Sequence, residues 1–224
     1  MKAAVIVSLV CLFLSHLGWA SPDPQDAHVL VDKKIHSLLA KIQASKGQSQ
    51  FTDEQKIQLV DNELGDVVDF KRIARRVMAK HFRGASKEQK YAFLAVFKGS
   101  LLNTYAKGLW EFNDYKINLL PLNEANQSER NTKVSFEVVT SSGQVFPVTQ
   151  SLFFNKKQNQ WMVQNVIING INMGLLFREQ FSRLVAQNNG SLDQAIASWS
   201  VNPQNSSLSE PIASDDESDL EGGE

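Results

Sequence analysis

The chain has 224 residues, of which 42% are hydrophobic, and it carries 23 basic against 24 acidic side chains. This length suits one ordinary domain with additional segments, and the hydrophobic content excludes a wholly disordered chain. The only cysteine of the sequence, Cys11, lies in an apolar run near the N-terminus. We therefore expect a domain that is stabilised by its hydrophobic core without disulfides.

The N-terminus has the composition of a secretory signal peptide. Lys2 precedes an apolar run over residues 3–14, and Gly-Trp-Ala precedes Ser21. This order predicts a signal peptide over residues 1–20 that is cleaved after Ala20. A membrane anchor is the alternative, but it needs about 20 consecutive apolar residues, and this run is shorter. We therefore expect an exported protein.

Charge is unevenly distributed along the chain. Residues 203–224 contain seven acidic side chains and no basic one. Low hydrophobicity combined with like charges predicts a disordered acidic tail. Without this tail and without Lys2, 22 basic and 17 acidic residues remain. The predicted folded domain, residues 21–202, is therefore positively charged.

The first half of the chain has the periodicity of helices. Apolar residues recur three to four positions apart, which is the pattern of amphipathic helices. Thr52 with Gln55 and Ser86 with Gln89 have the spacing of capping boxes, and Asp69 is a suitable N-cap. The predicted helices cover residues 26–45, 52–64, 70–82 and 86–111.

From residue 115 onward the pattern changes to strands. Four mostly apolar segments are separated by short turns, so we expect them to pair as antiparallel hairpins. Helices covering one face of an antiparallel four-stranded sheet give an α+β fold. A long amphipathic helix and a short one follow the strands, with Asn-Asn-Gly as a C-cap between them. The predicted strands cover residues 115–122, 132–140, 144–154 and 161–168.

The last strand and the helix after it organise the domain. Trp161 and Val163 have one parity in this strand, while Val166 and Ile168 have the other. Side chains alternate between the two faces of a strand. All four can share a face only if a bulge near residues 164–165 adds one residue. We predict this bulge, and with it a concave apolar surface.

The inner face of the sheet and the helices would enclose a large apolar region. The inward side chains match apolar stripes on at least three helices. This pattern fits a filled core, which is the more common case, and it also fits a ligand cavity, so both interpretations stay open. The inner-face residues are Phe146, Val148, Leu152, Val163, Val166 and Ile168.

Residues suited to catalysis or metal binding are scarce. Beyond the predicted signal peptide the histidines are His28, His36 and His81, and they lack metal-ligand spacing. The sequence contains no G-x-S-x-G elbow and no glycine-rich phosphate loop. Glu137, the acid in the predicted strands, has the parity of the outer face. We predict no enzymatic activity, no metal, no cofactor and no nucleic-acid partner.

Three segments resemble one known family. They are the run from Asp69 to Arg83 with Ser86 to Gln89, the W-x-V-x-x-V-x-I-x-G pattern from Trp161 to Gly170, and F-R-x-Q-F from Phe177 to Phe181. Together they are similar to the MlaC or toluene-tolerance family, the periplasmic phospholipid carriers of the pathway that maintains lipid asymmetry. The resemblance covers residues 31–199. It departs from the family pattern at His81, Asn165 and Asn169, where an aromatic residue and two acids are usual.

The resemblance implies an NTF2-like or cystatin-like fold with an apolar lipid cavity between sheet and helices. Both acyl chains of a glycerophospholipid would lie inside, with the headgroup in solvent. The implied partners are phospholipid, an outer-membrane lipoprotein–porin complex and an inner-membrane ABC transporter complex with MCE domains, and the implied compartment is the periplasm. The expected lipid contacts are Phe97, Leu101, Tyr105, Leu109, Phe146, Val148, Leu152, Val163, Val166, Ile168, Met173 and Phe177.

The basic helix gives a second expectation. Because the domain is positively charged, we expect its exposed cations to dock the membrane partners. The residues concerned are Arg72, Arg75, Arg76 and Arg178.

Two other functions stay open at this point. An enzyme or a binder of small hydrophobic ligands on the same fold would need an acid or a tyrosine in the cavity, and Tyr105 is the candidate. A scaffold protein would instead have a solid core and would act through its basic helix and acidic tail.

Overall fold

The computed structural model describes residues 22–46, 51–111, 115–123, 125 and 127–201. Within these residues the chain forms seven helices and one five-stranded antiparallel sheet. The predicted signal peptide and the predicted acidic tail lie outside the described residues. Among the helices of the described part, none is both long and apolar enough to cross a membrane.

The helices of the first half begin where their caps predict. Thr52 and Gln55 exchange backbone and side-chain hydrogen bonds, and Ser86 and Gln89 do the same, so both capping boxes are confirmed. The side chain of Asp69 accepts a hydrogen bond from the backbone N–H of Arg72, also as predicted. The helices are α1 (Pro24–Lys46), α2 (Asp53–Leu64), α3 (Phe70–Met78), α4 (His81–Gly84) and α5 (Lys87–Glu111).

The prediction of one helix over residues 70–82 is wrong, because the chain breaks after Met78. Ala79 has φ 45° and ψ −123°, which no helix continues through. Its N–H still bonds back to the carbonyl groups of Arg75 and Arg76, which closes α3. The break places the ring of Phe82 beneath two cations, Arg75 and Lys90. No glycine or proline marks it in the sequence.

The sheet has one more strand than predicted. Asn169 and Gly170 have φ values of 50° and 81° and form a two-residue hairpin turn. The two residues after the turn pair back onto the preceding strand before the next helix begins. The strands follow chain order across the sheet: β1 (Lys116–Leu119), β2 (Asn131–Val139), β3 (Val145–Asn155), β4 (Gln160–Ile168) and β5 (Ile171–Asn172).

The predicted bulge in β4 is confirmed. Ser151 of β3 pairs with Asn165, but the next residue, Leu152, pairs with Val163, so Gln164 is the extra residue. As a result Trp161, Val163, Val166 and Ile168 all lie on one face of the sheet. Antiparallel partners share a face, so the register extends this inner face across β2, β3 and β4.

Helix α6 (Met173–Gln187) is joined to the sheet by a compact polar contact. The side chain of Asn165 donates to Asn172, which caps α6, and accepts from the backbone N–H of Gly174 at 3.0 Å. Gly174 permits this approach, because a Cβ there would lie 2.7 Å from the Asn165 oxygen. After α6, Asn189 and Gly190 have positive φ, as expected of a C-cap, and α7 (Leu192–Ala197) follows.

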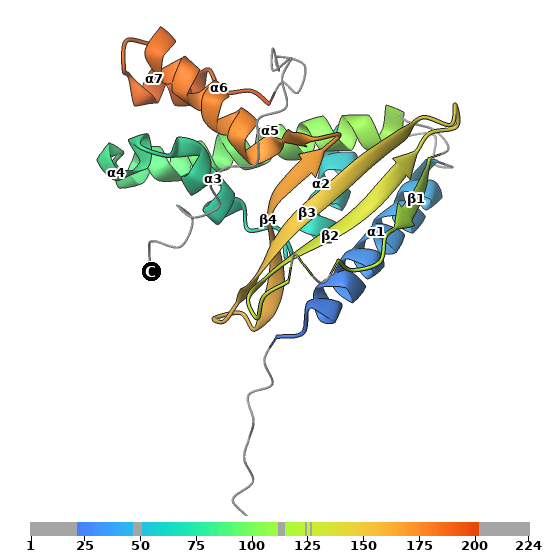
Figure 1. Cartoon of the computed structure of the whole chain (residues 1–224). Coiled ribbons are helices and arrows are strands. Elements are labelled where there is room, and N and C mark those ends of the chain that lie inside the picture. Colours follow the sequence, from blue (N-terminus) through green and yellow to red (C-terminus); the bar gives the residue numbers. More distant parts are fainter. Residues whose placement is uncertain (1–21, 47–50, 112–114, 124, 126, 202–224) are drawn as a thin grey trace, which may run out of the picture.

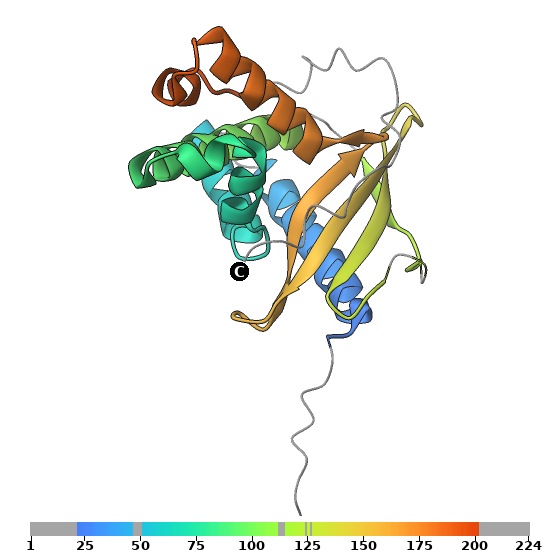
Figure 2. The same cartoon turned by 60° about the vertical axis from the view of Figure 1, so that its left-hand side comes forward.

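The helices divide into two groups around the sheet. Figures 1 and 2 show α1 running along one face of the sheet, while α3, α4, α6 and α7 gather beyond its β4 edge. The second group packs against α5 and shares with it a hydrophobic centre, which we call the helical cluster. Its aromatic members are Phe93, Phe97, Phe177, Phe181 and Trp199.

Candidate functional site

The inner face of the sheet is covered unequally. Val148, Leu152 and Val163 are buried where α1 contributes Ala27 and Val31 to the same hydrophobic cluster. Other inward side chains of the sheet are only half-buried, although they face the interior. They are Val138, Phe146, Val166 and Ile168. Apolar side chains that are inward-facing and still accessible indicate that the covering helices leave space in front of them.

Helix α5 presents four predicted lipid contacts on one face. Phe97, Leu101, Tyr105 and Leu109 follow one another at four-residue spacing, which places them in one row. Phe97 and Leu101 are buried in the helical cluster. Tyr105 is different, because 37% of its surface is accessible while burial raises the pKa of its hydroxyl group. Tyr105 is therefore the most accessible residue of this row.

The structure does not gather the twelve predicted lipid contacts into one continuous cluster. A second cluster, which we call the sheet cluster, is formed by buried residues of α1 and of strands β2 to β4. Ile168 packs against both the helical cluster and the sheet cluster and therefore connects them. Leu109 packs beside α2 in a third, smaller cluster. Tyr105 and Phe146 belong to none of these clusters. Of the others, Phe97, Leu101, Met173 and Phe177 lie in the helical cluster, and Val148, Leu152, Val163 and Val166 lie in the sheet cluster.

Sequence reasoning missed two polar residues of the inner face. Gln150 has the parity of Val148 and Leu152 in β3 and pairs with Val134 and Val166. Thr132 pairs with Leu152 on the same face, and its hydroxyl is buried without a hydrogen-bond partner. The alternation of β2 and β3 contains this signal, because Thr132 and Gln150 have the parity of the inward apolar residues.

The four arginines expected to dock the membrane partners differ in their contacts and in their burial. The guanidinium of Arg72 stacks on the ring of Phe153 at 4.1 Å, and its Nε donates to the bulge residue Gln164 at 3.0 Å. Arg72 is half-buried, and burial lowers the pKa of its guanidinium. It therefore fastens α3 to the sheet. Arg75 and Arg178 are exposed on α3 and α6, two helices that pack together, whereas Arg76 is half-buried.

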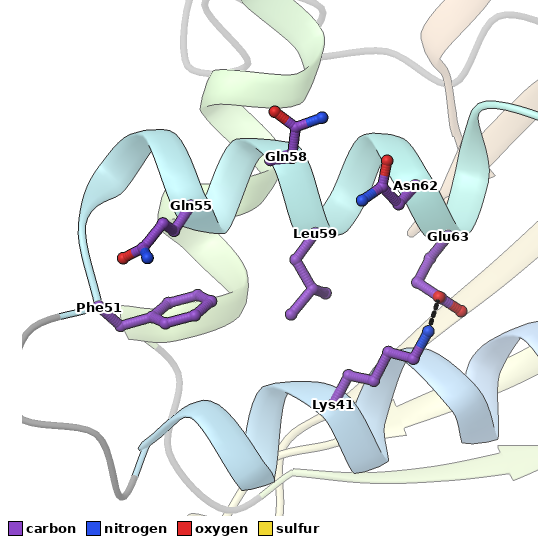
Figure 3. A pocket seen from close by; sticks show the side chains of 7 residues that line it. All are labelled: Lys41, Phe51, Gln55, Gln58, Leu59, Asn62 and Glu63. Atoms are coloured by element: carbon purple, nitrogen blue, oxygen red, sulfur yellow. Dashed lines mark hydrogen bonds and ion pairs between the residues drawn. The ribbon is translucent and has the colours of Figure 1, made fainter.

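A separate pocket of about 320 Å³ lies between α1 and α2. Figure 3 shows Leu59 and Glu63 of α2 pointing toward α1, where Lys41 pairs with Glu63. Gln58 and Asn62 point away from α1. No predicted lipid contact lines this pocket, so it is distinct from the inner-face site.

The family-level comparison decides the classification. The model of the MlaC protein family matches residues 32–201, which is about three quarters of the chain. The chain belongs to the MlaC family. The resemblance that the three sequence segments indicated is thereby confirmed.

Two relatives of this MlaC-family chain support the same conclusion. The toluene tolerance protein ttg2D of Pseudomonas putida is 34% identical over 176 residues, which cover 78% of this chain and 80% of that protein. The intermembrane phospholipid transport system binding protein MlaC of Haemophilus influenzae is 21% identical over 180 residues, covering 75% of this chain and 83% of that protein.

A solved structure shares the fold. It is the phospholipid-binding protein from Ralstonia solanacearum in complex with a phospholipid. The two structures have a TM-score of 0.67 at 23% sequence identity, over 77% of this chain and 97% of the other. The predicted α+β fold is confirmed. The expected four strands are corrected to five among the described residues.

Proposed function

We propose that this protein is a periplasmic phospholipid carrier whose apolar cavity lies between the inner face of the sheet and helices α1 and α5. Family membership supports the proposal, as do the phospholipid-related names of a MlaC relative and of the structural neighbour. The observation that carries it is the set of accessible apolar side chains on the covered face of the sheet. In a filled core these inward side chains would be buried.

The physical need for such a carrier is large. Each buried CH₂ group contributes about 0.8 kcal/mol, so the two chains of a phospholipid resist exposure to water by about 20 kcal/mol. A membrane shelters the chains almost equally well. The carrier's net affinity relative to a bilayer is therefore small, and docked partners can control loading through modest differences in affinity. No covalent step is required.

An enzyme on the same fold is the weaker alternative. Tyr105 is the candidate acid or base on the proposed cavity wall. Burial raises the pKa of its hydroxyl group above the ordinary value of 10.0, which moves it further from neutrality. A tyrosine with a raised pKa is a poor general base at pH 7. A group of three or more potential metal ligands is absent from the described residues.

Lipid extraction tests the proposal. The protein is purified without detergent, extracted with organic solvent and analysed for phospholipid by mass spectrometry and for phosphorus per mole of protein. We expect glycerophospholipid in a fixed ratio to protein. A protein that carries no phospholipid, and takes none up from vesicles, would contradict the proposal.

The location belongs to the same proposal. We propose that the signal peptide is removed after Ala20 and that the mature chain is released into the periplasm. N-terminal sequencing of protein from that compartment should give Ser-Pro-Asp. An intact N-terminus in the membrane fraction would contradict it.

The proposed partners are an outer-membrane lipoprotein–porin complex and an inner-membrane ABC transporter complex with MCE domains. The exposed cations Arg75 and Arg178 are suited to contact them, because charge pairs at a rim mainly accelerate association. Replacing both by Glu should weaken binding to membranes that contain these complexes, most strongly at low salt. Bound phospholipid should stay constant.

The matched control is Lys33→Glu, the same kind of charge reversal at an exposed position of α1. Loss of phospholipid in the double Arg variant, or equal loss of docking in the control, would contradict the assignment of these two residues.

A further inference from the structure

Gln150 is a polar side chain at the centre of an apolar surface. It lies on the inner face of β3, between Val148 and Leu152 on its own strand. Across the sheet it pairs with Val134 on one side and Val166 on the other. Val134, Val148 and Leu152 are buried, whereas Gln150 and Val166 are half-buried. The amide group therefore borders the accessible part of the inner face.

The side-chain amide of Gln150 lacks a partner in the described part of the chain. Among the described residues, the structure records no side-chain hydrogen bond for Gln150. Thr132, its diagonal neighbour on β2, has a buried hydroxyl group that is also unpaired. Diagonal neighbours on adjacent strands lie within reach of one small group. A buried polar group is normally satisfied, so the Thr132 hydroxyl calls for a ligand, an ion or water beside the half-buried amide of Gln150.

We propose that the side-chain amide of Gln150 donates a hydrogen bond to the carbonyl oxygen of an acyl ester of the bound phospholipid, with the Thr132 hydroxyl beside it. This inference rests on the proposed carrier function. A phospholipid has few polar atoms between its phosphate and its hydrocarbon chains, and these ester oxygens are acceptors, which match the amide and hydroxyl donors. The inner-face positions of the described strands carry no charged side chain, so a phosphate finds no cation there.

A diether phospholipid tests this contact, because it has the same chains and headgroup but lacks the ester carbonyl oxygen. Dissociation constants are measured for a diester phosphatidylethanolamine and for its diether analogue, each in competition with one fluorescent phospholipid. The wild-type protein should bind the diester about two- to tenfold more tightly, the effect of one neutral hydrogen bond. In Gln150→Met, which keeps the length of the side chain without its donor, the two lipids should bind equally.

The melting temperature of the lipid-free protein gives an independent readout. The half-buried amide of Gln150 makes no side-chain hydrogen bond among the described residues, so an apolar side chain of the same length removes no such bond from the lipid-free fold. Gln150→Met should therefore melt at the same temperature as the wild type or higher when lipid-free, and should gain less from added diester lipid. The matched control is Gln58→Met, the same change at an exposed position of α2, which should alter neither readout.

The outcomes separate the two proposals. If the wild type binds both lipids equally, or if Gln150→Met keeps the diester preference, the ester contact is wrong while the carrier function stands. If lipid-free Gln150→Met melts at a lower temperature, the amide supports the fold and the inference is also wrong. If neither lipid binds to the wild type, the carrier function itself fails.

Discussion

The helical cluster and the inner face of the sheet are built from the same kinds of residue, yet they are packed differently. In the helical cluster Phe93 is fully buried. The centroid of its ring lies 4.5 Å from that of Phe181 and 5.3 Å from that of Trp199. On the inner face, Phe146 and Val166 point inward and are only half-buried. One region is filled by its own side chains, and the other leaves part of its apolar surface accessible.

This difference explains how one small domain can be stable and still hold a ligand. The helical cluster and the α1 end of the sheet supply the buried apolar area on which the fold depends. In the proposed carrier, the accessible part of the inner face would exchange its contacts between lipid and water. The joint of Asn165, Asn172 and Gly174 connects the two regions through β4 and α6.

The largest expected effect contrasts two phenylalanines. Phe93→Ala should lower the free energy of unfolding by about 3 to 5 kcal/mol, because it leaves a cavity among packed rings. Phe146→Ala should cost about 1 kcal/mol, because that side chain is only half-buried in the folded state. Urea denaturation of both lipid-free variants measures the difference. Equal costs would mean that the inner face is as filled as the helical cluster.

A second prediction concerns a buried carboxylate between α1 and α2, outside both regions. The Glu63 carboxylate is buried and accepts hydrogen bonds from Lys41 and Ser37, which hold its pKa below the ordinary 4.5. Glu63→Gln should cost about 1 to 3 kcal/mol at pH 7. A depressed carboxylate pKa stabilises the fold above the unfolded pKa, and this contribution is lost as pH falls through the folded pKa.

The gap in stability between wild type and Glu63→Gln should therefore narrow when the pH is lowered below about 4.5. Denaturation curves at pH 7 and at more acidic pH measure it. A gap that does not change with pH would show that the carboxylate charge makes no contribution. Phospholipid binding at pH 7 should be unaffected, since Glu63 lies between α1 and α2.

A smaller effect is expected at the joint between the regions. Gly174→Ala would bring a Cβ to within 2.7 Å of the Asn165 oxygen, so the Asn165 side chain has to move and its bond to the backbone is lost. We expect a cost of about 1 kcal/mol. In the background of Asn165→Ala the same change should cost less, because the clash is gone. Strictly additive costs would contradict this account of the joint.

Much of the architecture could be predicted from local chemistry. The capping boxes at Thr52 and Ser86 are formed by neighbouring residues, and the bulge at Gln164 was the only way to place four apolar side chains on one face. The break at Ala79 could not be predicted, because neither a glycine nor a proline marks it and an alanine adopts the positive φ there. Strand β5 was missed because two residues are too short to show a period.

The candidate site was harder to predict than the fold. Periodicity identifies side chains that face inward, but it does not show how completely helices from distant parts of the sequence cover them. Phe97 and Val166 therefore looked alike in the sequence, although one is buried among rings and the other is half-accessible. Similarly, Arg72 and Arg75 look alike on α3, but only Arg72 reaches Phe153 and Gln164.

The most direct test introduces the same large side chain into both regions. Val166→Trp should occupy space that acyl chains use, so phospholipid phosphorus per mole of protein should fall sharply while the melting temperature of the delipidated protein changes little. Val77→Trp, in the fully buried helical cluster, should instead overpack a filled core and cost about 1 to 3 kcal/mol or more. If Val166→Trp destabilises the delipidated protein as much as Val77→Trp and leaves bound phospholipid unchanged, the inner face is a solid core and the proposed cavity does not exist.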